Sequence, residues 1–164
     1  MQDERDFFIE SIHQCESGMY TLAFEILRNE DDAADVIQES ILKAYCSLDV
    51  LRDKKRFRPW MMSIIHNTAI EFLRKNRNLV DWEAQEEPAA PEVGVDRDTK
   101  LTVREAVQRL RLPYRLVIIL FYYQSYSVKQ ISTITSTPAA AVRQQLSRGR
   151  KMLASMLCRE DFVQ

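Results

Sequence analysis

The chain has 164 residues, enough for one domain or two small ones, with 46% hydrophobic residues, 29% charged residues and a formal net charge of −1. Only three glycines occur, which excludes the glycine-rich turns that cradle phosphates, and the longest apolar run, residues 116–123, is too short to span a membrane. The start of the chain lacks a secretory pattern, so we expect a cytoplasmic protein. Three scattered cysteines and two histidines form no zinc-binding pattern, so we expect reduced thiols and no metal.

Charge is distributed unevenly along the chain. Residues 1–78 hold 11 Lys/Arg against 14 Asp/Glu (−3), residues 79–100 hold 2 against 7 (−5), and residues 101–164 hold 10 against 3 (+7). The middle segment also contains two prolines and little apolar surface, which predicts a flexible acidic linker. The predicted architecture is therefore all-α, with two small helical domains, residues 1–78 and 101–164, joined by the linker 79–100.

Two helices are predicted in the first part of the chain. Apolar residues recur at helical spacing from Phe7 to Leu27. Asn29 is then a candidate N-cap, followed by acids in a first turn, where the helix dipole favours negative charge. The second helix is apolar on one side and carries Asp32, Asp35, Gln38, Glu39 and Lys43 on the other. That polar side is either a solvated face or a docking face for a basic partner.

The densest positive stretch, residues 51–58, has five cations against one acid, and we expect Pro59 to stop any helix through it. Such a loop suits single-stranded nucleic acid, because cations hold phosphates and an aromatic ring stacks a base. The candidate residues are Arg52, Lys54, Lys55, Arg56 and Phe57. Alternatively, Phe57 and Trp60 are core anchors and the cations are solvated.

Residues 60–77 are predicted to form an amphipathic helix. Asn67, Arg74 and Lys75 lie on its outer side or at its end. Basic residues in a last turn also complement the helix dipole, so Arg74 and Lys75 have a purely structural explanation as well.

The basic C-terminal part predicts a helix-turn-helix. A helix over residues 101–112 ends at Pro113, and residues 116–123 form a largely buried helix. Ser127 and Gln130 make a capping box for a short helix. A turn and the pair Thr137–Pro138 then precede a last helix over about residues 139–157.

The last helix is expected to have two different faces. Val142, Leu146, Gly149 and Leu153 fall on one side, and the other side carries Arg143, Gln144, Ser147, Arg148 and Lys151. Arg and Gln can contact guanine and adenine edges in the major groove, so this face predicts DNA binding. The alternative is an ordinary amphipathic helix with a charged surface.

Three stretches resemble the extracytoplasmic-function sigma factors. Residues 31–45 resemble the core-binding helix of that family, and residues 57–67 with Arg74 and Lys75 resemble its promoter-melting and −10 element portion. Residues 103–153 resemble its C-terminal domain, with Leu110–Pro113 and the helix-turn-helix in the expected order. The resemblance covers nearly the full chain. It implies a bacterial alternative sigma factor, not an enzyme, that binds core RNA polymerase and directs promoter-specific initiation.

The resemblance also implies roles for single residues. The coiled coil of the polymerase β′ subunit would be bound by a face that contains Asp35, Gln38 and Glu39. An extruded −10 base and nearby DNA would be contacted by Arg52, Lys54, Lys55, Arg56, Phe57, Asn67, Arg74 and Lys75. The −35 major groove would be faced by Arg143, Gln144, Ser147, Arg148 and Lys151. The expected partners are the β′ and β subunits, promoter DNA and an anti-sigma protein, often membrane-bound, with no cofactor, metal or small-molecule substrate.

The helix-turn-helix departs from the usual family pattern at Gln130, Ser136, Ala140, Ala141 and Gln145. Family members usually carry Glu, Gly, Gly-Thr and Arg at these positions. The changes remove a hydroxyl and a cation near the DNA backbone, so we expect −35 contacts that are weaker or differently placed. Two alternatives remain: a free-standing helix-turn-helix regulator, and a polymerase-docking accessory protein that no longer recognises promoters.

Overall fold

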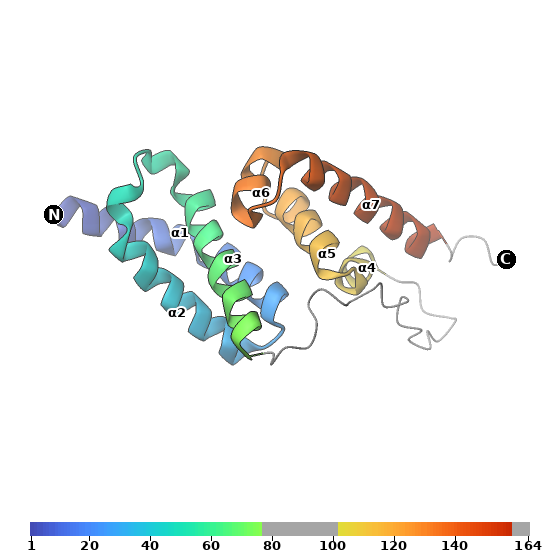
Figure 1. The fold of residues 1–164 in the computed structure, drawn as a ribbon, viewed down its shortest axis with the longest axis horizontal. Helices are drawn as coiled ribbons and strands as arrows, with labels where there is room; N and C mark the ends of the chain where they lie inside the picture. Colours follow the sequence, from blue (N-terminus) through green and yellow to red (C-terminus); the bar gives the residue numbers. More distant parts are fainter. Residues whose placement is uncertain (77–101, 159–164) are drawn as a thin grey trace.

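The structure, a computed structural model, describes residues 1–76 and 102–158, which are helical with no β-strand among them. The N-terminal group contains α1 (Gln2–Leu27), α2 (Glu30–Cys46) and α3 (Phe57–Asn76), with the short turns η1 (Leu48–Val50) and η2 (Lys54–Arg56) between α2 and α3. The C-terminal group contains α4 (Val103–Arg109), α5 (Leu112–Ile118), the π-helical turn η3 (Ile119–Tyr123), α6 (Val128–Thr135) and α7 (Ala139–Cys158). Figure 1 shows the two groups side by side, which confirms the predicted all-α, two-domain fold. The predicted linker, residues 79–100, lies outside the described residues.

Local capping signals set several helix starts. The Asn29 side chain accepts a hydrogen bond from the Asp32 backbone N–H (2.9 Å), as predicted for the start of α2. The Ser127 hydroxyl accepts from the Gln130 N–H (3.1 Å), and the Gln130 side chain accepts from the Ser127 N–H (2.9 Å). These reciprocal bonds are the predicted capping box, and they fix the start of the short helix α6.

Pro59 and Pro113, each expected to mark the end of a helix, both lie in the first turn of a helix, and α4 ends before Pro113 as predicted. Helix α3 begins at Phe57 and runs through Pro59, and α5 begins at Leu112 with Pro113 in its first turn. The prediction that Pro59 stops a helix was therefore wrong. The first four N–H groups of a helix have no acceptor within it, so a proline in the first turn loses no hydrogen bond.

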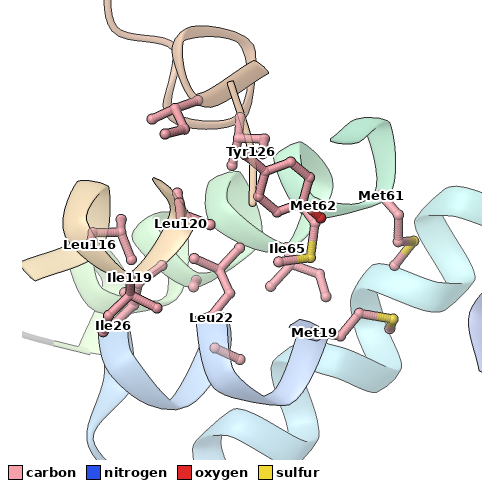
Figure 2. Close-up of a cluster of buried hydrophobic side chains, with 14 of the residues drawn as sticks. Met19, Leu22, Ile26, Met61, Met62, Ile65, Leu116, Ile119, Leu120 and Tyr126 are labelled. Atoms are coloured by element: carbon pink, nitrogen blue, oxygen red, sulfur yellow. The ribbon is translucent and has the colours of Figure 1, made fainter. Parts of the chain in front are cut away.

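A continuous hydrophobic core joins the two helical groups. Met19 and Leu22 of α1 and Met62 and Ile65 of α3 are fully buried, and so is Leu120 of η3. Figure 2 shows that side chains from α1, α3 and the α5–η3 segment point toward one another in one cluster. The domains therefore share an apolar contact, which the sequence did not predict.

A buried ion pair lies beside this apolar contact. Arg115 Nε is 3.0 Å from Glu25 Oε2, and the two side chains are only 11% and 10% exposed. The Arg115 guanidinium also donates to the backbone carbonyls of Glu25 and Leu110, both at 2.8 Å. Arg28 lies 3.2 Å from the same carboxylate, and the Gln108 amide donates to it at 3.0 Å. Burial lowers the pKa of Arg115 from its ordinary value, and the nearby Glu25 opposes that shift.

The opposite end of the contact is held through Arg58. Its guanidinium donates to the Gln124 carbonyl (3.2 Å) and lies 4.8 Å from the centre of the Tyr126 ring. A Cβ atom on Gly18 of α1 would come within 2.9 Å of the Gln124 side chain, so the backbone of α1 approaches this residue closely. We call the whole contact, from Glu25–Arg115 to Arg58–Tyr126, the domain seam.

Candidate functional site

The polar residues predicted to meet a protein partner lie together on one exposed side of α2. Asp35, Gln38 and Glu39 are exposed, while Val36 and Ala44 on the other side are buried in the core. Leu42 and Tyr45 extend the same helix outward, with 67% and 53% of their surfaces exposed. Large exposed apolar side chains beside carboxylates favour a docking face over a merely solvated one. Sequence reasoning missed Leu42, although it follows Glu39 at helical spacing.

The basic loop before α3 presents its cations to solvent. Arg52, Lys54, Lys55 and Arg56 are all exposed. The loop is shaped by Asp53, whose carboxylate accepts from the Lys55 backbone N–H at 3.0 Å and caps η2. Lys54 Nζ also lies 4.7 Å from the centre of the Phe7 ring, and Arg56 Nε lies 3.8 Å from the Asp53 carboxylate. All four cations remain exposed, so they can reach phosphates along a nucleic-acid strand.

Phe57 does not belong to this exposed set. Its side chain is only 3% exposed and lies in edge contacts with Phe7 and Phe8, with ring centres 5.7 and 5.8 Å apart. Trp60 packs against the same ring at 5.7 Å. Of the two alternatives from the sequence, the structure supports the core anchor. The expected stacking of a base on Phe57 is therefore corrected, because the ring would first have to leave the core.

The remaining candidate residues of α3 are exposed. Asn67, Arg74 and Lys75 all reach solvent, and Lys75 Nζ lies 3.0 Å from Glu71 on the previous turn. Burial lowers the pKa of His66, next to Asn67, so its ring stays neutral near pH 7. The start of α3 and Arg74 are about 26 Å apart along the helix axis, given a rise of about 1.5 Å per residue. We call the surface from the loop to the end of α3 the cationic track; its cations lie at its two ends, since residues 59–73 contain no Lys or Arg.

The predicted helix-turn-helix forms as α6, a tight turn and α7. Ser136 ends α6 in a left-handed conformation (φ 52°), and the Ser132 hydroxyl donates to the Thr137 carbonyl at 2.6 Å across the turn. On α7, Val142, Leu146 and Gly149 are buried. The predicted outer face is exposed in full: Arg143, Gln144, Ser147, Arg148 and Lys151. The structure thus brings these five side chains together on one accessible surface of the C-terminal domain.

Within residues 1–76 and 102–158, no three His, Cys, Asp or Glu side chains come together as a metal site. No helix of this same part of the chain has the length and apolar character needed to cross a membrane.

Sequence reasoning missed the polar residues of the domain seam. Glu25 lies between Phe24 and Ile26 in a buried part of α1, and Arg115 directly precedes the apolar run 116–123. A single charge inside an apolar stretch signals a buried partner, because an unpaired charge is not tolerated there. The sequence carries that signal, but it does not say which residue is the partner.

Comparisons with known proteins agree with this arrangement. The family models Sigma-70 region 2 and Sigma-70, region 4 match residues 12–79 and 100–153. The RNA polymerase sigma factor SigV of Bacillus subtilis (strain 168) is 32% identical over 163 residues, which cover 98% of this chain and 97% of that protein. The ECF RNA polymerase sigma factor SigW of the same organism is 25% identical over 171 residues, which cover 94% of this chain and 90% of that one.

Two solved structures share the fold. One is the sigma factor RpoE in complex with the anti-sigma factor NepR from Bartonella quintana, with a TM-score of 0.68, 20% identity and coverage of 92% of this chain and 96% of that one. The other is CnrH in complex with the cytosolic domain of CnrY, with a TM-score of 0.64, 22% identity and coverage of 93% and 88%.

Proposed function

This chain belongs to the extracytoplasmic-function (ECF) RNA polymerase sigma factors. We propose that three of its exposed surfaces bind, respectively, the polymerase, the −10 element and the −35 element. The protein is an alternative sigma factor that binds core RNA polymerase and directs transcription initiation at promoters. Membership of this family decides against the free-standing regulator. In our proposal, residues 1–78 serve polymerase and the −10 element, residues 101–164 serve the −35 element, and residues 79–100 join them.

The first surface is the exposed side of α2, which binds the polymerase. Asp35, Gln38 and Glu39 supply carboxylate and amide groups, so the matching surface of the β′ subunit must supply cations or N–H donors. Leu42 and Tyr45 add apolar area beside them. Burial of that area on docking stabilises the complex, while the charges orient it.

The second surface is the cationic track of the N-terminal domain, which holds the opened −10 strand. Arg52, Lys54, Lys55 and Arg56 contact phosphates, and the amide and cations on α3 contact the adjacent DNA: Asn67, Arg74 and Lys75. Phe57 supports this surface from beneath by anchoring the start of α3 in the core.

The third surface is the outer face of α7, which enters the −35 major groove. Arg143, Gln144 and Arg148 carry groups that can contact base edges. Ser147 and Lys151 carry groups that can bind phosphates of the DNA backbone. That the altered residues of the turn motif make −35 contacts weaker or differently placed stays a prediction; these residues are Gln130, Ser136, Ala140, Ala141 and Gln145.

The remaining features of the proposal concern chemistry, location and regulation. Opening and holding DNA requires no covalent step, so we expect the protein to act in the cytoplasm without catalysis, cofactor or metal. An anti-sigma protein, possibly membrane-bound, is the expected regulator. Support for that partner comes from the solved structures of RpoE with NepR and of CnrH with the cytosolic domain of CnrY.

The observation that carries the proposal is that three exposed surfaces, one with carboxylates and two with cations, lie on different parts of the described chain: α2, the loop with α3, and α7. The test measures core polymerase binding and promoter-dependent transcription with purified components. Gln38→Ala with Glu39→Ala should abolish core binding without unfolding the chain.

A second pair of substitutions tests the −35 surface. Arg143→Ala with Arg148→Ala should leave core binding intact and weaken transcription, because two groups that can contact base edges are lost. Arg104→Ala, at an exposed cation of α4, is the matched control and should change neither property. Unchanged promoter transcription in the double variant would contradict the role of the α7 face. Core binding by the native chain without promoter-dependent transcription would instead indicate the polymerase-docking accessory protein.

A further inference from the structure

Four charged side chains form a continuous ladder between α2 and α3. Lys43 Nζ lies 2.9 Å from Glu39 Oε1 and 3.5 Å from Glu71 Oε2. Lys75 Nζ lies 3.0 Å from Glu71 Oε1. Charge therefore alternates in the order Glu39, Lys43, Glu71, Lys75, with each inner residue shared by two partners. We call this set the ion-pair ladder.

The ladder connects two surfaces that carry different proposed functions. Glu39, at one end, belongs to the proposed polymerase face, and Lys75, at the other end, belongs to the proposed −10 track. The inner residues, Lys43 and Glu71, have no role in either surface. Glu71 is also an acid on the same helix as Asn67 and Lys75, where a negative charge opposes the binding of DNA phosphates.

The inner residues are electrostatically engaged on both sides. The pKa of Lys43 is raised, first by its hydrogen bond to Glu39 and then by the charges of Glu39 and Glu71. The pKa of Glu71 is lowered, first by its hydrogen bond from Lys75 and then by the charges of Lys75 and Lys43. A change at either end of the ladder therefore alters the charge that the next residue experiences.

We propose that Lys43 and Glu71 are positioning residues that couple polymerase docking to DNA binding, an inference that rests on the proposed function of the two surfaces. When a cation or donor of the polymerase engages Glu39, Lys43 loses one carboxylate and turns to Glu71. The positive charge of Lys43, now closer to Glu71, offsets more of the negative potential that the Glu71 carboxylate produces at Lys75. The electrostatic attraction that holds Lys75 to Glu71 is therefore weaker. Lys75 becomes available for a phosphate. By linkage, DNA bound at Lys75 favours polymerase docking by the same factor.

The expected size of the coupling between polymerase docking and DNA binding depends on how exposed the ladder side chains are. All four side chains are between 42% and 72% exposed, and exposed ion pairs are weakened by water and salt. The expected effect is therefore about two- to fivefold in affinity at low ionic strength and near zero at high salt.

The test uses the free full-length chain and a fluorescein-labelled single-stranded DNA 20-mer, with affinity measured by fluorescence anisotropy at low salt. Glu71→Gln should raise DNA affinity about two- to fivefold, whereas Lys75→Gln should lower it. A gain of affinity is a result that mere structural damage does not produce. If Glu71→Gln leaves affinity unchanged while Lys75→Gln lowers it, the DNA surface stands and the ladder proposal fails. If Lys75→Gln has no effect, the proposed DNA contact at Lys75 and the ladder proposal both fail.

A double-mutant cycle then separates the ladder from general electrostatics. Glu39→Gln should raise DNA affinity in the native chain but not in the Glu71→Gln chain, because its effect passes through Glu71. Asp35→Asn is the matched control, since Asp35 lies on the same face of α2 and has no ion-pair partner in the described part of the chain. Its effect should simply add to that of Glu71→Gln. An equal effect of Glu39→Gln in both chains would overturn the proposal.

Lys43 provides the last arm of the experiment. Lys43→Arg keeps a cation between the two carboxylates and should preserve the effect of Glu39→Gln. Lys43→Met removes the link and should abolish that effect. Loss of coupling in both variants, or in neither, would contradict the role assigned to Lys43. Thermal unfolding of each variant by circular dichroism confirms that these surface changes leave the fold intact.

Discussion

Replacing Glu25 by Gln tests the strength of the domain seam. The substitution keeps the size of the side chain and removes the only carboxylate beside Arg115 in the described structure, 3.0 Å away. Loss of one partner from a buried ion pair destabilises a protein by about 3–5 kcal/mol. Arg28 would then lie near Arg115 with no carboxylate between them, which adds repulsion.

Two features reduce the expected loss. Arg115 keeps its hydrogen bonds to two backbone carbonyls, and Arg28 is 40% exposed, so water screens its charge. We therefore expect Glu25→Gln to lower the free energy of unfolding by about 3 kcal/mol, the lower end of that range.

Urea unfolding followed by circular dichroism measures this change. The denaturation midpoint should fall with little change in slope if the seam unfolds together with the domains. Glu16→Gln, at an exposed acid of the same helix, is the control and should stay within about 0.5 kcal/mol of the native chain. Adding Arg115→Met to Glu25→Gln should restore part of the loss, because the unpaired charge is removed. If Glu25→Gln unfolds like Glu16→Gln, the ion pair does not stabilise the seam.

Three further predictions follow from other parts of the structure. Fluorophores on the exposed Cys46 and Cys158 should show higher energy transfer in the free chain than in the promoter-bound holoenzyme, and equal transfer would mean that the seam stays closed. Ser136→Gly should raise the free energy of unfolding by about 1 kcal/mol, measured by thermal melting, because glycine adopts the left-handed conformation without strain; a lower melting temperature would refute this. Burial raises the pKa of Tyr126 from 10.0 to about 12, so the neutral ring stabilises the folded state below pH 10, and that contribution is lost as pH rises from 10 to 12. Tyr126→Phe should flatten this decline in urea titrations, and an unchanged decline would assign it to other groups.

The parts of the fold that the sequence predicted are those set by near neighbours. The cap at Asn29 and the capping box of Ser127 and Gln130 involve residues three apart, so a short stretch of sequence contains the whole interaction. The outer face of α7 was predicted for the same reason, because helical periodicity alone separates its exposed and buried sides.

The incorrect or missed parts depend on context beyond the local sequence. A proline breaks a helix from an interior position but is tolerated in the first turn. For this reason α3 begins at Phe57, three residues before the predicted start at Trp60, and includes Pro59. Phe57 is aromatic beside cations, a pattern that fits both base stacking and core packing, and only its contacts with Phe7 and Phe8 decide between them. The pair Glu25 and Arg115 is separated by 90 residues, so no local rule could join them.

The domain seam and the proposed promoter contacts cannot all be made at once. The −10 and −35 elements are about 25 base pairs apart, or about 85 Å of B-form DNA at roughly 3.4 Å per base pair. A compact body of this chain length has a radius of gyration of about 15 Å, which corresponds to a diameter of about 40 Å. Residues 77–101 can reach at most about 80–90 Å when fully extended, which matches the distance between the two elements. Promoter binding through both domains therefore requires the Glu25–Arg115 pair to separate, and polymerase and DNA contacts must together offset the loss of the seam. Weakening the seam should then favour promoter complexes even as it destabilises the free chain.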